Sequence, residues 1–345
     1  MSHVLITGAS GFFGSVLKRR LLAEGFAVTT VDIIPDSDQS PNLTTVRGDI
    51  CDRNLMRSIF SATQFSAVIH CAALLAHGSV DVASLWQTNV EGTRVVAECC
   101  REFNVTQLLF ISTNCLWGRN AGHAIDEYEE PKPIEPYGRS KLAAEQLLMD
   151  YERDLNVVIL RCPTIIDSGR LGLLSILFEF VNDGKTIWVV GDGSNRYQFI
   201  YAQDLASACL LALNHPESDV FHVGSDNVPP LRAVYETIIR DAKSRSRIRS
   251  LPKRPAIAAM RIAHSLKLSP LGPYHAQMIA EDFIFDTRKI RERLGWAPTL
   301  TNEEMLTLAY RYYTTKREEI LARRDVSPHC RNAPMGIIRL LKWVS

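Results

Sequence analysis

The sequence predicts an α/β fold, in which a doubly wound parallel sheet carries a smaller C-terminal α/β lobe. Short runs rich in Val, Ile and Leu alternate with helical stretches over the first half of the chain, as expected for strands buried between two layers of helices. The 345 residues correspond to about two domains. Prolines and glycines become commoner after Pro163 and the helical pattern becomes less regular, so we expect the smaller lobe to begin there.

The individual elements follow from these runs in chain order. The predicted strands are 4–7, 27–32, 43–47, 67–70, 108–112 and 157–161. The predicted helices are 14–23, 82–103 and 137–153. Residues 200–213 have the pattern of a strand and a helix that return to the sheet. The chain ends with a short amphipathic stretch, 336–344, which is expected to dock on the protein's own core or to fray.

The composition is that of an ordinary globular protein, with 46% hydrophobic and 22% charged residues. Lys and Arg total 39 and Asp and Glu total 38, so the net charge of +1 gives no general attraction to nucleic acid or to an acidic membrane. No apolar run is long enough to span a bilayer, and no secretory signal opens the chain. The eight cysteines show no C-x-x-C spacing and are expected to be reduced thiols of a cytoplasmic protein.

A glycine-rich loop joins the first predicted strand to the first helix. Its sequence, T-G-A-S-G-F-F-G at 7–14, spaces the glycines as G-x-x-G-x-x-G. Gly8 permits a tight turn, Gly11 lets the backbone approach a pyrophosphate, and Gly14 lets the helix pack on the strand. The N–H groups at the start of the helix would then bind the phosphates. A plain tight turn between strand and helix is the alternative interpretation.

Two carboxylates follow the next strands. Asp32 closes the second strand, eighteen positions after Gly14, where a carboxylate can accept hydrogen bonds from the hydroxyls of an adenosine ribose. Because that carboxylate would repel a 2′-phosphate, NAD is favoured over NADP. Asp49 follows the third strand and could reach the adenine amine. Both residues can alternatively be simple turn carboxylates.

The second anchor is the sequence Y-G-R-S-K at 137–141. Tyr137 and Lys141 are four positions apart, so their side chains lie on the same face of a helix. A nearby cation is expected to lower the pKa of the phenol towards neutrality and make it a usable general base. Thr113, at the end of a predicted strand, could hold the same substrate oxygen. A solvated helix face is the alternative.

These motifs resemble those of the extended short-chain dehydrogenases/reductases, in the branch of nucleotide-sugar epimerases and dehydratases. The resemblance extends over residues 4–306. Besides the two anchors, the matching segments are H-C-A-A at 70–73, T-N-V-E-G-T at 88–93, S-T-N-C-L-W-G at 112–118, G-D-G-S-N-R at 191–196, F-I-Y-A-Q-D at 199–204 and L-G-W-A-P at 294–298.

The resemblance implies a domain organisation. Residues 1–163 would form a Rossmann-type NAD-binding domain, to which 199–213 return. Residues 164–198 and 214–325 would form the substrate-binding lobe, and 326–345 would be a C-terminal tail. In relatives the two long helices, 82–103 and 137–153, form a four-helix interface, which implies a homodimer.

The resemblance also implies roles for individual residues. Tyr137 would act as base and acid. Lys141 would hold the nicotinamide ribose and adjust the pKa of Tyr137. Thr113 would occupy the position of the Ser or Thr that the family has at this point. The residues implied around NAD are Gly8, Gly11, Phe12, Phe13, Gly14, Asp32, Asp49, Ile50, Ala72, Ala73, Asn89, Tyr137, Lys141 and Pro163. Those implied around a nucleotide-sugar substrate are Thr113, Asn114, Cys115, Thr164 and Arg196, with the guanidinium of Arg196 on the diphosphate.

The residues after Thr113 narrow the reaction. Sugar 4,6-dehydratases need an Asp-Glu pair there, whereas this chain has Asn114 and Cys115, and an amide cannot serve as the acid. A cysteine at this position moves protons in members that epimerise at C3 and C5, although a small buried hydrophobe is the commoner role. The partner acid or base of those enzymes has no counterpart in 164–173, where Arg170 titrates too high. What remains is redox chemistry at one carbinol, and our hypothesis is an NAD-dependent epimerase that works through a transient 4-keto sugar.

Several alternatives stay open. Thr164 replaces the asparagine of the R-x-x-N stretch, and Asp167 and Ser168 replace Gly-Pro, so an NAD(P)-dependent reductase or dehydrogenase of a keto sugar or hydroxysteroid-like alcohol is possible. A non-catalytic dinucleotide-binding sensor is a further alternative. The basic run 243–254 is expected to be a solvated surface or to attract an anionic ligand to the small lobe. His70 is expected to be a satisfied core histidine.

Overall fold

The computed structural model describes residues 2–75, 81–118, 122–266, 268, 279–322, 328–330, 332–333, 335–336, 338 and 342. At its centre is a seven-stranded sheet with the order β10-β6-β5-β4-β1-β2-β3, and every pair of neighbours is parallel. The order in which the chain adds strands reverses between β1 and β4, and doubly wound sheets bind their ligands at this switch point. Its strands are β1 (His3–Thr7), β2 (Ala27–Asp32), β3 (Leu43–Arg47), β4 (Ala67–His70), β5 (Gln107–Thr113), β6 (Asn156–Cys162) and β10 (Asp219–His222).

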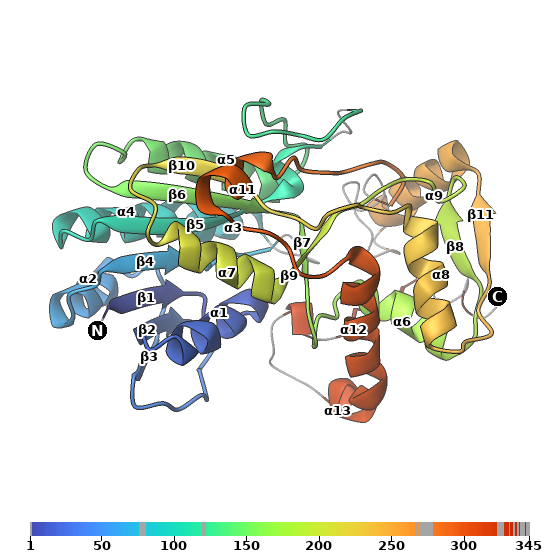
Figure 1. Cartoon of the computed structure of the whole chain (residues 1–345), viewed down its shortest axis with the longest axis horizontal. Helices are drawn as coiled ribbons and strands as arrows, with labels where there is room; N and C mark the ends of the chain where they lie inside the picture. The colour runs from blue at the N-terminus through green and yellow to red at the C-terminus, as the bar shows by residue number, and fades with distance from the viewer. Residues whose placement is uncertain are drawn as a thin grey trace.

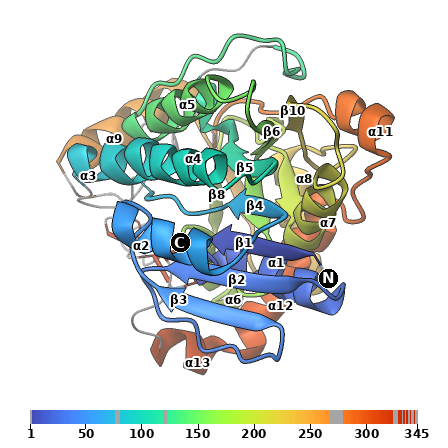
Figure 2. The same cartoon turned by 90° about the vertical axis from the view of Figure 1, so that its left-hand side faces the viewer.

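Helices cover both faces of this sheet (Figures 1 and 2). One face packs against α1 (Phe12–Ala23), α7 (Ala202–Ala212) and α11 (Arg288–Leu294), through buried residues that include Leu17, Leu205 and Ile290. The other face packs against α2 (Arg53–Ala62), α4 (Thr93–Glu102) and α5 (Pro136–Met149), through a second buried cluster. The predicted doubly wound parallel α/β fold is therefore confirmed.

The long helix predicted over 82–103 is interrupted. It consists of α3 (Val82–Trp86), a π-helical turn at Gln87–Gly92, and α4. Within the π-helical turn Asn89 is buried, and its carbonyl accepts a hydrogen bond from the Thr93 hydroxyl at 2.7 Å. A Cβ on Gly92 would lie 2.6 Å from the Ile50 side chain, so the turn passes close to the strand layer. Such turns often occur at functional sites.

The smaller lobe contains two short parallel sheets, β7 (Thr164–Ile166) with β9 (Phe199–Tyr201) and β8 (Ile187–Val190) with β11 (Ile248–Leu251). Figure 1 shows the second of these at the end of the molecule opposite the central sheet. A third buried cluster, which includes Phe178, Phe285 and Tyr313, forms the core of this lobe. Its helices are α6 (Leu174–Asn182), α8 (Leu231–Asp241), α9 (Lys253–Ser265), α12 (Asn302–Thr315) and α13 (Arg317–Ala322).

The return of the chain to the central sheet differs from the prediction. The strand expected within 200–213 does not join that sheet, because β9 pairs with β7 instead, and only α7 packs on the central sheet. The edge beside β6 is filled by β10, which lies in the range 214–325 that the sequence assigned to the smaller lobe. Trp296, from the same range, is buried in the core between the central sheet and α7, and its indole N–H donates to the Asp204 carbonyl at 2.9 Å. The range 214–325 therefore contributes to both parts.

The described residues near the C-terminus dock on α6. The Leu171 amide donates to the His329 carbonyl at 2.7 Å, beside the 3-10 turn Pro328–Cys330. The Lys342 ammonium lies 2.9 Å from the Glu179 carboxylate and 2.7 Å from that of Asp183. Most of the amphipathic stretch 336–344 lies outside the described residues.

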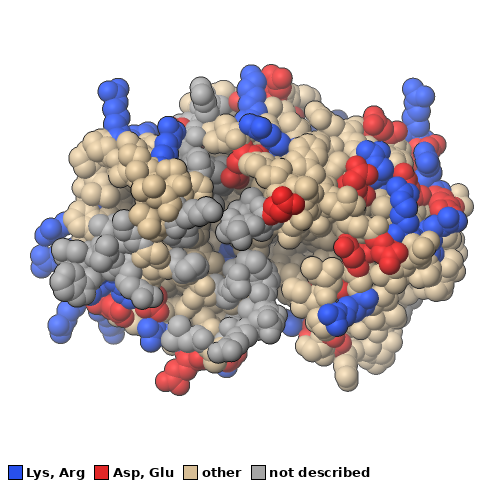
Figure 3. Space-filling model, turned by 180° about the vertical axis from the view of Figure 1, so that it is seen from behind, with Lys and Arg blue, Asp and Glu red and all other residues tan. Residues whose placement is uncertain are grey.

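Charged side chains of both signs are interspersed on the surface. In Figure 3, Lys and Arg side chains alternate with Asp and Glu over the right-hand part of the face. Some of these charges pair across helices, as Arg57 of α2 does with Glu102 of α4 at 2.5 Å. No helix among the described residues is long and apolar enough to cross a membrane.

Candidate active site

The glycine-rich loop forms a tight cradle at the carboxyl end of β1. Gly8 has a φ of +73°, and a Cβ there would lie 2.6 Å from the Ala72 amide nitrogen. A Cβ on Gly14 would lie 2.2 Å from the Gly8 carbonyl oxygen. Neither position can carry a side chain, because backbone atoms would have to move. The N-terminus of α1, with Phe12 and Phe13 in its first turn, therefore stays open for a pyrophosphate.

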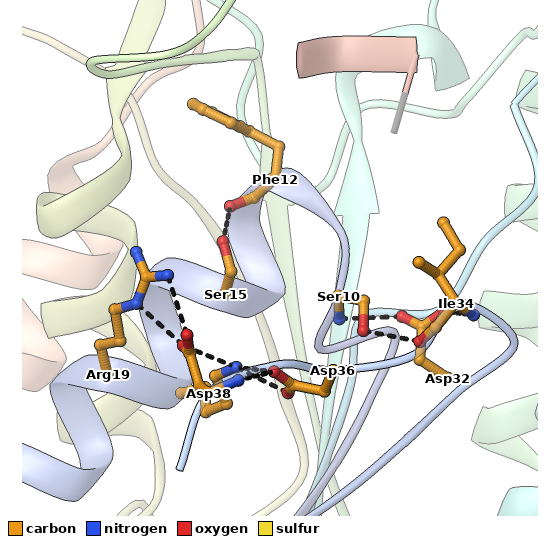
Figure 4. Close-up of polar contacts among 9 residues, drawn as sticks. Ser10, Phe12, Ser15, Arg19, Asp32, Ile34, Asp36 and Asp38 are labelled. Carbon is orange, nitrogen blue, oxygen red and sulfur yellow. Dashed lines mark hydrogen bonds and ion pairs between the residues drawn. The ribbon is translucent and has the colours of Figure 1, made fainter. Parts of the chain in front are cut away.

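Asp32 lies at the end of β2 beside this loop. One oxygen of its carboxylate accepts from the Ser10 amide at 2.9 Å and the other from the Ile34 amide, also at 2.9 Å. Figure 4 shows these contacts next to those of Asp36 and Asp38, which face α1. Asp32 forms no ion pair within the described residues, so its acceptor capacity remains available for ribose hydroxyls.

The loop after β2 is held to α1 by buried charge pairs. Lys18 is 1% exposed, and its ammonium lies 2.6 Å from the Asp36 carboxylate and 2.9 Å from that of Asp38. Arg19 adds a hydrogen bond to Asp38 at 3.0 Å, as Figure 4 shows. These pairs fix the backbone that follows Asp32.

The next two predicted cofactor residues make local contacts. Asp49 accepts from the Cys51 amide at 2.9 Å and so closes its own turn. Ile50 is 4% exposed and packs in the core beside Gly92. A role for either residue on the adenine remains a prediction.

A buried polar chain fixes the loop after β4. The Thr93 hydroxyl donates to the Asn89 carbonyl, so it accepts from Nε2 of His70 at 2.9 Å, and Nδ1 of His70 faces the Thr7 hydroxyl at 2.6 Å. The Ala72 amide donates to the same Thr7 hydroxyl at 3.2 Å. Burial lowers the pKa of His70 to about 3, so the ring is neutral. The prediction of a satisfied core histidine is confirmed, and the chain positions Ala72 and Ala73.

Asn89 connects this loop to α5. Its amide donates to the Leu74 carbonyl at 3.0 Å and to the Ser140 hydroxyl at 3.0 Å, and its oxygen accepts from the Leu74 amide at 2.7 Å. Ser140 in turn donates to the Tyr137 carbonyl at 2.8 Å. Both amide hydrogens of Asn89 are therefore used within the protein. Asn89 is a positioning residue for the loop at 71–75 and for the first turn of α5.

The structure brings Thr113 and Tyr137 together. The Thr113 side chain, at the end of β5, is hydrogen-bonded to that of Tyr137 and also accepts from the Cys115 amide at 3.1 Å. This contact requires α5 to approach the end of β5 closely. Gly138 allows it, because a Cβ there would lie 2.2 Å from the Cys115 carbonyl oxygen.

The electrostatics around Tyr137 differ from the prediction. Burial raises the pKa of the phenol well above its ordinary value, Coulombic interactions with Cys115, Cys162 and Glu135 raise it further, and the hydrogen bond to Thr113 lowers it. The expected lowering of this pKa by Lys141 is therefore wrong for this arrangement. Burial is the largest cause of the rise, and the Lys141 ammonium donates to the Ile111 carbonyl at 2.8 Å.

Two further groups near the phenol have shifted pKa values. Lys141 lies 3.6 Å from the centre of the Phe110 ring, and burial lowers the pKa of its ammonium to about 8. Glu135, which sequence reasoning missed, precedes α5, and burial raises the pKa of its carboxyl to about 7. Its only sequence signal is its position two residues before Tyr137.

A hydroxyl and amide cluster lies beside the pair. The Tyr197 hydroxyl accepts from the Asn114 amide at 3.0 Å and lies 2.9 Å from the Thr164 hydroxyl. Cys115 is 9% exposed, with its thiol 4.0 Å from the Asn114 oxygen. Pro163 is buried between β6 and β7. Sequence reasoning missed Tyr197, because the segment that resembles the family, G-D-G-S-N-R at 191–196, ends one residue before it.

Arg196 lies elsewhere. It is exposed, its amide donates to the Asp282 carboxylate at 2.7 Å, and it lines a cavity of about 550 Å³ with Ser225, Asp226 and Phe285. Within the described residues no hydrogen bond or ion pair joins Arg196 to Thr113, Tyr137 or Lys141. Because neighbouring residues of an extended chain point to opposite sides, the inward position belongs to Tyr197. A contact of Arg196 with a diphosphate remains a prediction.

Comparison with known proteins identifies the family. The sequence model described as the NAD dependent epimerase/dehydratase family matches residues 4–224. The chain belongs to this family. It is 35% identical over 318 residues to the uncharacterized protein y4nG of Sinorhizobium fredii, covering 92% of this chain and 80% of that protein.

Two named epimerases are also similar. The chain is 31% identical over 250 residues to UDP-glucose 4-epimerase of Erwinia amylovora, covering 61% of this chain and 73% of that protein. The solved structure of UDP-glucose 4-epimerase from Thermotoga maritima with UDP-glucose has a TM-score of 0.76 at 24% identity and covers 91% of this chain and 99% of its own. The resemblance to the nucleotide-sugar branch of the extended short-chain dehydrogenases/reductases is confirmed.

NAD is the cofactor of this epimerase/dehydratase family, and the residues of this chain fit it. The glycine cradle leaves room for a pyrophosphate against the backbone, since a Cβ at Gly8 or Gly14 would clash. Asp32 offers a carboxylate without a cationic partner in the described part of the chain, which suits the two hydroxyls of an adenosine ribose.

Proposed function

We propose that this protein interconverts epimers of a nucleotide-activated sugar at C4, through a transient 4-keto sugar. The observation that carries this proposal is the hydrogen-bonded pair Thr113–Tyr137 at the carboxyl edge of the sheet, with Lys141 one helical turn further along α5. Two hydroxyls that meet beside a dinucleotide cradle suit the oxidation and reduction of one carbinol. The similarity to proteins named UDP-glucose 4-epimerase supports the nucleotide-sugar substrate.

The residues that would hold the cofactor are those of the glycine loop, Asp32 and the loop at 71–75. Bound NAD supplies the acceptor and donor of a hydride. The protein's task is to hold the substrate hydroxyl beside it and to keep water away, which the buried surroundings of Tyr137 favour.

Proton transfer is assigned to Tyr137. The phenol takes the proton of the C4 hydroxyl during oxidation and returns it to the keto oxygen during reduction. Thr113 accepts or donates a hydrogen bond at the same oxygen and so fixes its position. Because burial raises the pKa of Tyr137, the phenolate needs a positive charge. The Lys141 ammonium, whose pKa is about 8, is still mostly protonated near neutral pH and would supply this charge by turning from the Ile111 carbonyl towards the phenol.

Dehydration is disfavoured by the residues after Thr113. Asn114 uses its amide to donate to Tyr197, and Cys115 carries a thiol in place of a carboxylic acid. Neither side chain can protonate a departing hydroxyl as a carboxylic acid does. A 3,5-epimerase that uses Cys115 would need a second acid or base next to the thiol.

The test is turnover of sugar nucleotides by the purified protein with its bound NAD. We expect UDP-glucose, UDP-glucuronic acid or another member of a UDP- and dTDP-sugar panel to convert to its C4 epimer, followed by NMR, with no net change of absorbance at the reduced nicotinamide band. Tyr137→Phe is expected to abolish the conversion. Turnover that consumes stoichiometric NAD(P)H would instead establish the reductase alternative, and cofactor binding without any turnover would establish the sensor.

We further propose a homodimer formed through α4 and α5. These helices lie side by side on one face of the sheet (Figure 2). Trp86 and Val82 of the adjoining α3 are 38% and 49% exposed and would be covered in such a dimer. Light scattering after gel filtration tests the dimer. The expected cytoplasmic location remains a prediction, with which the absence of disulfides among the described residues agrees.

A further inference from the structure

Arg170 lies in the connection between β7 and α6. Its amide donates to the Asp167 carbonyl at 3.0 Å, and the amide of the next residue, Leu171, donates to the His329 carbonyl. The segment at Pro328–Cys330 therefore binds the backbone of this connection next to Arg170. The guanidinium is directed to the site, because it lies 5.6 Å from the centre of the Phe12 ring in the cofactor loop.

The same guanidinium interacts electrostatically with the site residues Tyr137 and Tyr197 and with Cys162. These residues come from α5, from the segment before β9 and from β6. Arg170 thus lies among the catalytic phenol, the hydroxyl cluster and the start of α1, which is where a substrate reacting at Tyr137 would extend.

Arg170 is half-buried and is poorly satisfied compared with the buried cation Lys18. Its Nε is buried without a hydrogen-bond partner, and its guanidinium forms no ion pair within the described residues. Lys18, by contrast, is paired with Asp36 and Asp38. A buried charge without a partner carries a large desolvation cost.

The charge of Arg170 persists in spite of this burial. Burial lowers the pKa of the guanidinium only to about 10, so it remains protonated at neutral pH. A planar guanidinium donates two parallel hydrogen bonds to a carboxylate or a phosphoryl group. The missing partner of Arg170 is therefore an anionic oxygen group.

We propose that Arg170 is a specificity-determining residue that binds an anionic group of the substrate, a sugar carboxylate or a phosphoryl group, next to the carbinol that reacts at Tyr137. The proposal rests on the proposed function, since the anion belongs to the sugar nucleotide. An anion bound there replaces the lost hydration of the guanidinium and orients the sugar, while the Phe12 ring supports the guanidinium plane from one side.

The experiment compares Arg170→Gln and Arg170→Lys with the wild type and with Arg153→Gln, a matched control at an exposed arginine. Without ligand, thermal unfolding of Arg170→Gln is expected at the wild-type temperature or above it, because the variant loses an uncompensated charge. A clear drop in the unfolding temperature of Arg170→Gln alone would show that Arg170 serves the fold, and would overturn the proposal.

Calorimetric titrations then use UDP-glucuronic acid, UDP-glucose and UDP. If the anion is a carboxylate, Arg170→Gln loses about tenfold or more in affinity for UDP-glucuronic acid only. If it is a phosphoryl group, the affinity for all three ligands falls. Arg170→Lys is expected to lie in between, since it keeps the charge and loses the planar fork. Unchanged affinity for all three ligands would overturn the proposal, and so would loss of bound NAD, because the anion would then be the cofactor's.

A last experiment distinguishes failure of the Arg170 proposal from failure of the proposed function. If the wild type binds none of the three ligands, nucleotide-sugar chemistry is contradicted, and inorganic phosphate and malonate become the probes. Stabilisation of the wild type against heat by either anion, absent in Arg170→Gln and retained in Arg153→Gln, keeps Arg170 as an anion receptor. Equal responses of all variants would overturn it.

Discussion

Arg161 and Glu145 form a buried, two-pronged ion pair between β6 and α5. Nη2 of the arginine lies 2.7 Å from Oε2 of the glutamate, and Nε lies 3.2 Å from Oε1. The side chains are only 8% and 4% exposed, and the guanidinium lies 5.2 Å from the centre of the Trp117 ring. The arginine of the R-x-x-N stretch therefore anchors the catalytic helix to the sheet.

Glu145→Gln is expected to lower the free energy of unfolding by about 3–5 kcal/mol, because it leaves the Arg161 charge buried without a carboxylate. Urea unfolding followed by circular dichroism measures this change. The double variant Arg161→Met with Glu145→Leu removes both charges and is expected to recover most of the stability. If the single variant is as stable as the wild type, the pair does not anchor α5.

Gly138→Ala is expected to reduce kcat about tenfold or more while leaving the fold intact. The added Cβ meets the Cys115 carbonyl oxygen at 2.2 Å, so α5 must move away from β5 and separate Tyr137 from Thr113. Steady-state kinetics with the identified substrate gives the comparison. Arg139→Ala, at an exposed position of the same turn, serves as the control. A Gly138→Ala enzyme with wild-type kcat would contradict this geometry.

Glu135→Gln is expected to shift the acid limb of the pH profile of kcat/KM to lower pH. The Glu135 carboxylate is one of the charges that raise the pKa of Tyr137. Removal of that negative charge makes the phenolate easier to form, so the phenol ionises at lower pH. Profiles of the variant and of Glu130→Gln, which alters an exposed carboxylate of the preceding loop, are compared. A shift of the Glu135→Gln limb to higher pH would disprove the assignment.

The carboxyl of Glu135 also affects stability. Its pKa in the folded protein, about 7, lies above the ordinary value of 4.5, so the folded state binds the proton more tightly. Stability from this group is therefore present below pH 4.5 and is lost as the pH rises towards 7. In Glu135→Gln this part of the pH dependence of thermal unfolding is expected to disappear.

Asp32→Ala is expected to weaken NAD binding about tenfold or more and to narrow the preference for NAD over NADP. The variant removes the carboxylate that would accept from the ribose hydroxyls and repel a 2′-phosphate. Fluorescence titration of protein freed of cofactor measures both affinities, with Asp150→Ala, at the exposed end of α5, as control. Wild-type affinities in Asp32→Ala would remove this residue from the cofactor site.

Local sequence patterns predict much of the central sheet. The strands at 27–32, 43–47 and 67–70 are observed with the expected bounds, because each run is rich in apolar or β-branched residues, which favour strands. The glycine loop was predictable because its glycines stand where backbone atoms leave no room for a Cβ, as at Gly8 and Gly14. The helix expected at 14–23 begins two residues earlier, at Phe12.

The features that the sequence did not predict depend on distant contacts. β10 has only four residues, D-V-F-H, and its place beside β6 is set by pairing across the chain. The π-helical turn around Asn89 depends on Leu74 and Ser140, which flank it in space. The sequence also does not show that the Tyr197 side chain, and not that of Arg196, faces the site. The raised pKa of Tyr137 could not be predicted either, because it depends on burial by several elements of the fold.

The position of β10 has a consequence for synthesis of the protein. β6 ends at Cys162, but its outer neighbour is residues 219–222, so the ribosome must first make the intervening segment, which includes β7, α6, β8 and β9 of the smaller lobe, before the sheet can close. Until then the amides and carbonyls along the outer side of β6 are unpaired, and such a strand can recruit another chain. A nascent or truncated product that ends near Cys162 is therefore an aggregation hazard, which ends when β10 pairs with β6.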